Sequence, residues 1–108
     1  MNEQVQTELK KIFNSRFSTS ESARANYARG EDTYDPILSQ AVVFPETNEE
    51  VSKLLKLCNE HKIPVVPFGT GTSLEGNVVG NENGITISLE KMNKILDVNV
   101  EDFDCRVQ

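Results

Sequence analysis

The middle of the chain carries a strand–helix–strand pattern, and this pattern limits the fold more than any other feature. Residues 41–44 (AVVF) form a short apolar run rich in β-branched side chains, which predicts a buried strand. A second apolar run, residues 63–66 (IPVV), predicts another strand after the intervening helix. A helix that connects two strands favours a βαβ unit, and we expect its two strands to be parallel.

The helix between these strands has clear start and end signals. Thr47 and Glu50 have the spacing of a capping box, which fixes the first turn. One apolar face follows, formed by Val51, Leu54, Leu55 and Cys58, with Leu57 beside them. His61 and Lys62 stand where the helix should end, at the negative end of its dipole. The pattern predicts an amphipathic helix with one buried face.

Two shorter helices are predicted before this unit. Residues 4–13 carry apolar side chains at helical spacing. Ser18 and Glu21 have capping-box spacing, which predicts a short helix that runs to about Asn26. The polar stretch 28–36 (ARGEDTYDP) ends in a proline and predicts a loop.

Three strands are predicted after the unit. Residues 81–84 (NENG) predict a turn, and residues 85–90 then alternate apolar and polar side chains, as a strand with one buried face does. Residues 94–100 predict a further strand, 101–104 a turn, and 105–108 the start of one more strand. We expect Cys105 to be buried and Phe103 to serve in packing. A sheet that ended with the strand begun at residues 105–108 would leave an unpaired edge, which suggests the first part of a longer fold.

Composition excludes several classes of function. With 17 acidic and 11 basic residues the net charge is −6, so the chain lacks the basic face that binding to nucleic acid or to anionic membranes needs. No apolar window is long enough for a transmembrane helix, and the N-terminus has no apolar secretory segment. His61, Cys58 and Cys105 do not form a metal-ligand cluster, and we expect both cysteines to be reduced.

A glycine-rich stretch, residues 67–80 (PFGTGTSLEGNVVG), follows the second strand of the βαβ unit. Ligands bind outside the carboxyl ends of strands in α/β sheets, and successive N–H groups in a glycine loop can form a nest for an anion. The stretch lacks the lysine of a P-loop and the third glycine of the G-x-G-x-x-G motif. Two interpretations stay open from the residues alone: an amide nest for a screened pyrophosphate, or a glycine-rich connection without a ligand.

The segment IPVVPFGTGTSLEGNVV resembles the pyrophosphate loop of the flavin-dependent D-2-hydroxyacid dehydrogenases, which include D-lactate dehydrogenases and glycolate oxidase flavin subunits. The resemblance extends over residues 13–36, 41–69 and 92–108, which is nearly the whole chain. It implies an α+β fold, the N-terminal part of a PCMH-type (vanillyl-alcohol-oxidase-type) FAD-binding domain with a βαβ unit followed by further strands. It also implies a helical lead-in, residues 1–36, and the first part of the FAD-binding domain, residues 37–108, truncated at its C-terminus.

The resemblance implies which residues hold the cofactor. Loop amides and hydroxyls would bind the FAD pyrophosphate, namely those of Gly69, Thr70, Gly71, Thr72 and Ser73. Pro67 and Phe68 would shape the entry to the loop, and Gly76 would allow close packing under the cofactor. Thr72 stands where distant members carry a histidine that attaches the flavin, so the resemblance implies non-covalent FAD. The family's catalytic residues and metal ligands lie downstream, and none is assigned to this chain.

Members of this family oxidise a D-2-hydroxy acid to the 2-keto acid and pass the electrons to an acceptor such as a cytochrome or a quinone. The resemblance implies the FAD-binding part of such an oxidoreductase, with D-lactate as the preferred substrate of the whole protein. We expect this chain alone to bind FAD weakly or not at all and to show no turnover. Two alternatives remain: a non-catalytic FAD-binding or interaction module completed by a separate chain, and a small scaffold without a ligand. By resemblance the protein is intracellular, mitochondrial in a eukaryote and otherwise cytoplasmic.

Overall fold

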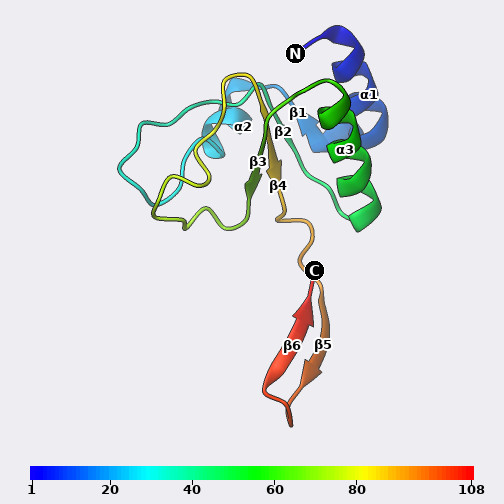
Figure 1. The fold of residues 1–108 in the computed structure, drawn as a ribbon, viewed down its shortest axis with the longest axis vertical. Coiled ribbons are helices and arrows are strands. Elements are labelled where there is room, and N and C mark those ends of the chain that lie inside the picture. Colours follow the sequence, from blue (N-terminus) through cyan, green and yellow to red (C-terminus); the bar gives the residue numbers. More distant parts are fainter.

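The computed structural model describes residues 1–108, which form a four-stranded sheet with helices against it and a separate hairpin (Figure 1). The elements in chain order are α1 (Glu3–Phe13), the 3₁₀ helix η1 (Asn14–Arg16), β1 (Phe17–Ser18), α2 (Glu21–Asn26), β2 (Ala41–Val43), α3 (Asn48–Glu60), β3 (Val65–Phe68), β4 (Ile85–Ser88), β5 (Ile95–Asn99) and β6 (Asp104–Val107). Each predicted helix and strand is present, which confirms the mixed α+β class, and β1 is an addition.

The strands of the main sheet lie in the order β1-β2-β4-β3. β2, β4 and β3 are parallel, and β1 pairs antiparallel with β2 at one edge. The predicted parallel relation of β2 and β3 is therefore confirmed, but the two are not neighbours, because β4 lies between them. The chain returns through a long loop to insert β4, so the carboxyl ends of all three parallel strands meet at one edge.

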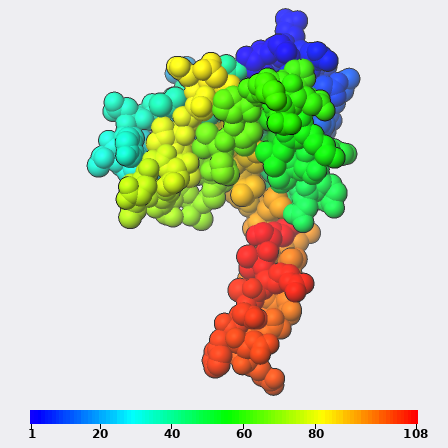
Figure 2. All heavy atoms as spheres, in the orientation of Figure 1, coloured from blue at the N-terminus to red at the C-terminus, as the bar shows by residue number.

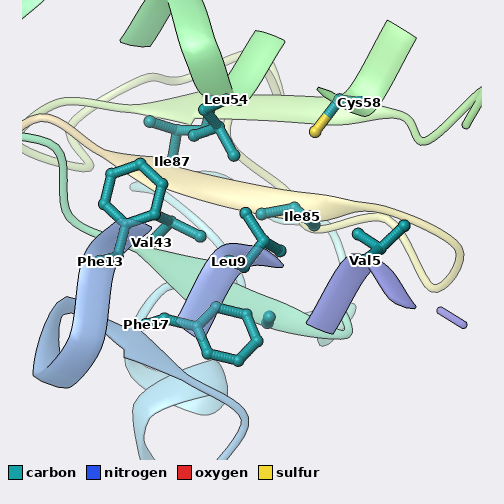
Figure 3. Close-up of a cluster of buried hydrophobic side chains, with 10 residues drawn as sticks. Val5, Leu9, Phe13, Phe17, Val43, Leu54, Cys58, Ile85 and Ile87 are labelled. Atoms are coloured by element: carbon teal, nitrogen blue, oxygen red, sulfur yellow. The ribbon is translucent and has the colours of Figure 1, made fainter. Parts of the chain in front are cut away.

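One hydrophobic core lies between the sheet and the helices α1 and α3 (Figure 3). Its ten buried side chains are Val5, Leu9, Phe13, Phe17, Ala41, Val43, Leu54, Cys58, Ile85 and Ile87. Helix α1 supplies three of them at intervals of four residues, because those positions share one helix face. The lead-in and the rest of the chain thus share a single core, and the division at residue 36 stays a prediction.

The central strand β4 is buried on both faces, although its alternating pattern predicted one exposed face. Ile85 and Ile87 point into the core, whereas Thr86 and Ser88 point to the opposite face. Polar side chains are tolerated there because they find partners: the hydroxyls of Thr86 and Ser39 lie 2.7 Å apart, and both residues are buried. Period-two alternation therefore distinguishes the two faces of β4 but not their exposure.

Strands β5 and β6 form a two-stranded hairpin that projects from the body as a narrow stalk (Figure 2). Residues 95–98 and 100–107 are exposed. The expectation that Cys105 is buried and that Phe103 serves in packing is wrong for this structure, since Cys105 is exposed and Phe103 is 96% exposed. No other element covers the hairpin, so its apolar side chains have nothing to pack on.

Two capping predictions need correction. Helix α2 is capped by Ser20, whose hydroxyl accepts from the N–H of Ala23, and not by Ser18. The chain is still extended at Ser18, because this residue belongs to β1 and pairs with β2. In α3 the Thr47 hydroxyl does accept from the N–H of Glu50, but the Glu50 carboxylate binds the N–H of Glu46 instead of returning to Thr47.

The second strand of the βαβ unit starts and ends later than predicted. It covers residues 65–68, so Pro67 lies inside β3 and does not end it. Proline is accepted there because β3 is an edge strand that pairs with β4 alone. On α3, Leu54 and Cys58 are buried as predicted, but Leu55 is 45% exposed and lines an open groove of about 710 Å³ with Val51, Leu89 and Met92.

Candidate functional site

The glycine-rich stretch forms the connection from β3 to β4 at the carboxyl edge of the parallel strands. An open pocket of about 740 Å³ lies at this edge. Phe68, Gly69 and Thr70 line one side of it, Leu89 and Glu90 just after β4 line another, and Tyr27 from the lead-in lies beside them. The loop thus leaves the sheet where the carboxyl ends of the neighbouring strands β3 and β4 lie, the edge at which ligands bind in α/β sheets.

The backbone of the loop leaves its donors free. None of the N–H groups from Gly69 to Val78 donates a hydrogen bond within the protein. Gly71 has φ +75° and Gly76 has φ +76°, a conformation that other residues rarely adopt. A Cβ added to Gly69 would meet no atom within 4 Å, so the backbone there is open to close approach by a ligand. Free amides around an open backbone are what an anion nest requires.

Three hydroxyl groups lie along the same loop. The Thr70 and Thr72 hydroxyls are 3.1 Å apart, and Ser73 donates to the side-chain oxygen of Asn77 at 2.6 Å. Thr70 and Thr72 are exposed, and Ser73 is half-buried. No lysine or arginine lies between Gly69 and Gly76. Any anion on this loop would therefore be held by neutral N–H and O–H donors, which suits a pyrophosphate already partly screened.

The structure places all eight predicted site residues in one continuous segment, with different surroundings. Pro67 and Phe68 end β3, and Phe68 is buried. The ring of Phe68 lies against Gly71, since a Cβ added to Gly71 would be 2.6 Å from the ring atom Cζ. Gly76 lies against the ring of Tyr34, which a Cβ would approach to 2.9 Å. Both glycines thus allow an aromatic ring to pack directly on the loop.

Sequence reasoning missed the aromatic residues of the lead-in that contact this region. The Tyr27 ring packs edge-on against Phe44 and Phe68, with ring centroids 5.4 and 5.1 Å apart. Its hydroxyl donates to Glu90 Oε1 at 2.8 Å. Burial raises the pKa of the Tyr27 phenol, and the hydrogen bond to Glu90 raises it further. Tyr34 in the polar stretch 28–36 and Tyr27 just before it were the available signal, because aromatic rings in a polar segment usually find a surface to pack on.

No group of three or more histidine, cysteine, aspartate or glutamate side chains is placed to hold a metal ion. None of the helices has the length and apolar character needed to cross a membrane.

The chain is similar to several curated proteins. It is 41% identical over 91 residues to a probable mitochondrial D-lactate dehydrogenase of Danio rerio, a match that covers 84% of this chain and 18% of that protein. It is 33% identical over 92 residues to the glycolate oxidase subunit GlcD of Bacillus subtilis, covering 85% of this chain and 20% of that protein. The chain thus spans about a fifth of the length of these relatives.

Solved structures show the same fold. An alkyldihydroxyacetonephosphate synthase superposes with a TM-score of 0.87 at 24% identity, covering all of this chain and 23% of that one. A p-cresol methylhydroxylase superposes with a TM-score of 0.75 at 21% identity, covering 89% of this chain and 20% of that one. The predicted PCMH-type fold is confirmed by these superpositions.

Residues 39–108 match the family described as the FAD binding domain. The matched range begins just before β2 and contains α3, β3, the glycine loop, β4 and the hairpin. The glycine loop and most of the pocket at the carboxyl edge lie within this range, and the lead-in contributes Asn26 and Tyr27 from outside it. The resemblance found in the sequence is confirmed, and the chain belongs to the FAD binding domain family.

Proposed function

We propose that this chain is the FAD-binding part of a flavoprotein oxidoreductase that oxidises a D-2-hydroxy acid to the 2-keto acid, with D-lactate as the preferred substrate. The observation that carries the proposal is the run of free N–H donors from Gly69 to Val78 at the carboxyl edge of the sheet. The names of the Danio rerio and Bacillus subtilis relatives support this substrate class. The oxidation itself is proposed for a whole protein of their length, and this chain alone has no turnover.

Within the loop, the amides and hydroxyls of residues 69–73 hold the FAD pyrophosphate. Pro67 and Phe68 fix where the loop leaves β3, and Gly76 lets the loop pass close to the Tyr34 ring. The cofactor is bound without a covalent link, because the loop contains no histidine, cysteine or tyrosine to form one. Bound FAD supplies the capacity to accept two electrons from the substrate, and the protein orients it.

The proposal assigns residues 37–108 to the FAD-binding domain and residues 1–36 to a lead-in that packs against it. An electron acceptor such as a cytochrome or a quinone would serve the whole protein. The expected affinity of this chain for FAD is weak, because a loop on one side of the cofactor leaves the other side in water.

The test is a titration of the ¹⁵N-labelled chain with FAD and, separately, with inorganic pyrophosphate, followed by amide chemical shifts. Both ligands should shift the amides of Gly69 to Ser73 in a saturable manner at millimolar concentration. The informative variant is Gly69→Val, because a Cβ there would have no protein atom within 4 Å and the added bulk should obstruct a ligand. Its spectrum without ligand should match the parent except near residue 69, and its ligand-induced shifts should be lost.

A matched control is Glu82→Ala, in the exposed turn at the opposite edge of the sheet, which should bind both ligands as the parent does. The proposal for the loop fails if neither ligand shifts these amides in a folded chain, or if Gly69→Val binds as well as the parent. Measurable oxidation of D-lactate by the chain alone would contradict the statement that it has no turnover.

One observation favours the alternative of a module completed by a separate chain. The β5–β6 hairpin exposes apolar side chains on both strands, with Ile95 of β5 71% and Val107 of β6 56% exposed. Apolar strands of this kind are usually covered by further protein. Mixing the chain with a candidate flavoprotein partner should then raise its FAD retention, and failure of the two to co-purify would exclude this alternative.

A further inference from the structure

A continuous series of contacts runs from the lead-in to the loop. The Tyr27 hydroxyl donates to Glu90 Oε1 at 2.8 Å, which fixes the direction of the side chain. The Tyr27 ring meets the Phe68 ring edge-on at 5.1 Å between centroids. The other end of the Phe68 ring lies against Gly71, one of the two glycines with positive φ. Tyr27 therefore reaches the loop through a single intermediate side chain.

The backbone that follows Tyr27 lies against the back of the same loop. The Ala28 carbonyl accepts hydrogen bonds from the N–H groups of Ile37 and Gly80, at 3.3 and 3.1 Å. A Cβ added to Gly30 would lie 2.8 Å from the carbonyl oxygen of Ser73 and 3.1 Å from that of Gly71. The loop carbonyls are thus turned toward the lead-in. Within residues 69–80 only the N–H of Val79 donates to a loop carbonyl, that of Gly76 at 3.2 Å, so the loop takes much of its shape from this external support.

We propose that Tyr27 is a positioning residue for the anion-binding loop: held by Glu90, it fixes the Phe68 ring, and that ring sets the backbone shape at Gly71 on which the amide nest depends. Tyr27 lies outside the residues that match the FAD binding domain family, so the lead-in takes part in forming the site. The inference rests on the proposed function for its binding consequence, whereas its effect on the loop can be measured without a ligand.

The expected effect on FAD affinity follows from the fraction of chains whose loop has the shape that binds the ligand. A ligand that binds only one shape of the loop has an apparent dissociation constant equal to its intrinsic value divided by the fraction of chains with that shape. If removal of the Tyr27 ring lowers this fraction to about a tenth, the dissociation constant for FAD rises about tenfold. Loss of the hydroxyl alone keeps the ring contact and should raise the constant by roughly twofold to threefold.

The experiment compares Tyr27→Ala, Tyr27→Phe and Glu90→Ala by amide shifts and hydrogen exchange without ligand, and by FAD titration. Tyr27→Ala should shift the Gly71 amide signal and increase the hydrogen-exchange rate and mobility of that amide. Tyr27→Phe, which keeps the ring, should have a spectrum close to that of the parent. Glu90→Ala removes the acceptor at an exposed side chain, so it keeps the proposal testable if Tyr27→Ala does not fold. Glu90→Ala should give the same change at Gly71 as Tyr27→Phe gives.

Tyr34→Ala is the matched control, because Tyr34 contacts the loop at Gly76 and not at Gly71. It should change the Gly76 amide and leave the Gly71 amide as in the parent. The inference is overturned if folded Tyr27→Ala keeps the parent Gly71 shift and FAD affinity, or if Tyr34→Ala disturbs Gly71 equally. A changed loop in the Tyr27 variants, together with no FAD binding by the parent, would support the positioning role and reject the proposed function.

Discussion

The ion pair between Arg16 and Glu50 joins the lead-in to the βαβ unit, and its removal gives a testable effect. Glu50 Oε2 accepts from Arg16 Nη1 at 2.5 Å, and Oε1 accepts from Nη2 at 2.7 Å. Glu50 Oε2 also accepts from the N–H of Glu46 at 2.8 Å, and Arg16 Nη1 donates to the Phe44 carbonyl at 3.1 Å. The cluster ties the segment before β1 to the end of β2 and to the first turn of α3.

Glu50→Gln keeps the shape of the side chain but replaces one acceptor oxygen with an NH₂ group that faces other donors. A hydrogen bond to a charged group contributes about 1.5–3 kcal/mol net when it is protected from water. Here the two side chains remain 20% and 21% exposed, so solvent screening reduces the gain. We expect the free energy of unfolding to fall by about 1–2 kcal/mol and Tm by roughly 5–12 °C.

The effect must depend on pH with a definite sign. Hydrogen bonds from Arg16 hold the pKa of the Glu50 carboxyl below its usual range. A carboxyl with a lowered pKa in the folded state stabilises the fold fully above its unfolded pKa, about 4.3 for glutamate, and loses that contribution as the pH falls through the folded value. The difference between the parent and Glu50→Gln should therefore be largest at neutral pH and vanish in acid.

Urea unfolding followed by circular dichroism, over a series of pH values, measures this difference. Glu49→Gln is the control, because Glu49 is an exposed residue of the same helical turn and contacts no arginine. It removes the same charge near the helix N-terminus and so accounts for the dipole contribution. Equal destabilisation by both variants, or a Glu50→Gln effect that persists in acid, would refute the reasoning.

Three further predictions concern the core and its buried polar pair. Only Cys105 should react with a thiol reagent in the native state, because Cys58 is buried and its burial raises the pKa of its thiol; both should react in denaturant, as counted by absorbance or mass spectrometry. Leu54→Ala should lower the free energy of unfolding by about 2–5 kcal/mol, measured in urea, because Leu54 is fully buried between α3 and the sheet. Thr86→Val should cost about 1–2 kcal/mol in the same assay, because the shape is kept but the Ser39 hydroxyl loses one of its two partners and keeps only the N–H of Asn81; no loss would mean that the Ser39–Thr86 pair contributes nothing.

The sequence predicted well where one local rule acts alone. α3 begins after Thr47 because its hydroxyl satisfies a free N–H, and Leu54 and Cys58 are buried because they share a helix face. The position of the glycine loop followed from the end of β3 in the same way. These features depend on neighbours within about one helical turn or one strand, and such neighbours are visible in the sequence.

The features that escaped prediction depend on partners far along the chain. β1 is only two residues long and exists because Phe17 and Ser18 pair with β2. Its pairing keeps Ser18 extended, and this explains why the cap of α2 moves to Ser20. The polar face of β4 can be buried because Ser39, 47 residues away, supplies a hydrogen-bond partner for Thr86. No pattern within a short window carries information of this kind.

The candidate site depends both on neighbours in the sequence and on partners far along the chain. Its donors are local: free N–H groups and hydroxyls from residues 69–78, with no cationic side chain among them. In a chain with a net charge of −6, such a loop cannot draw an anion by long-range attraction, so the direction of its donors has to supply the affinity. That direction is set from elsewhere, by Phe68 at the end of β3 and by Tyr27 and Gly30 in the lead-in. A loop that binds by geometry and not by charge needs a rigid support, and here the support comes in part from the segment that the glycine-rich motif does not include.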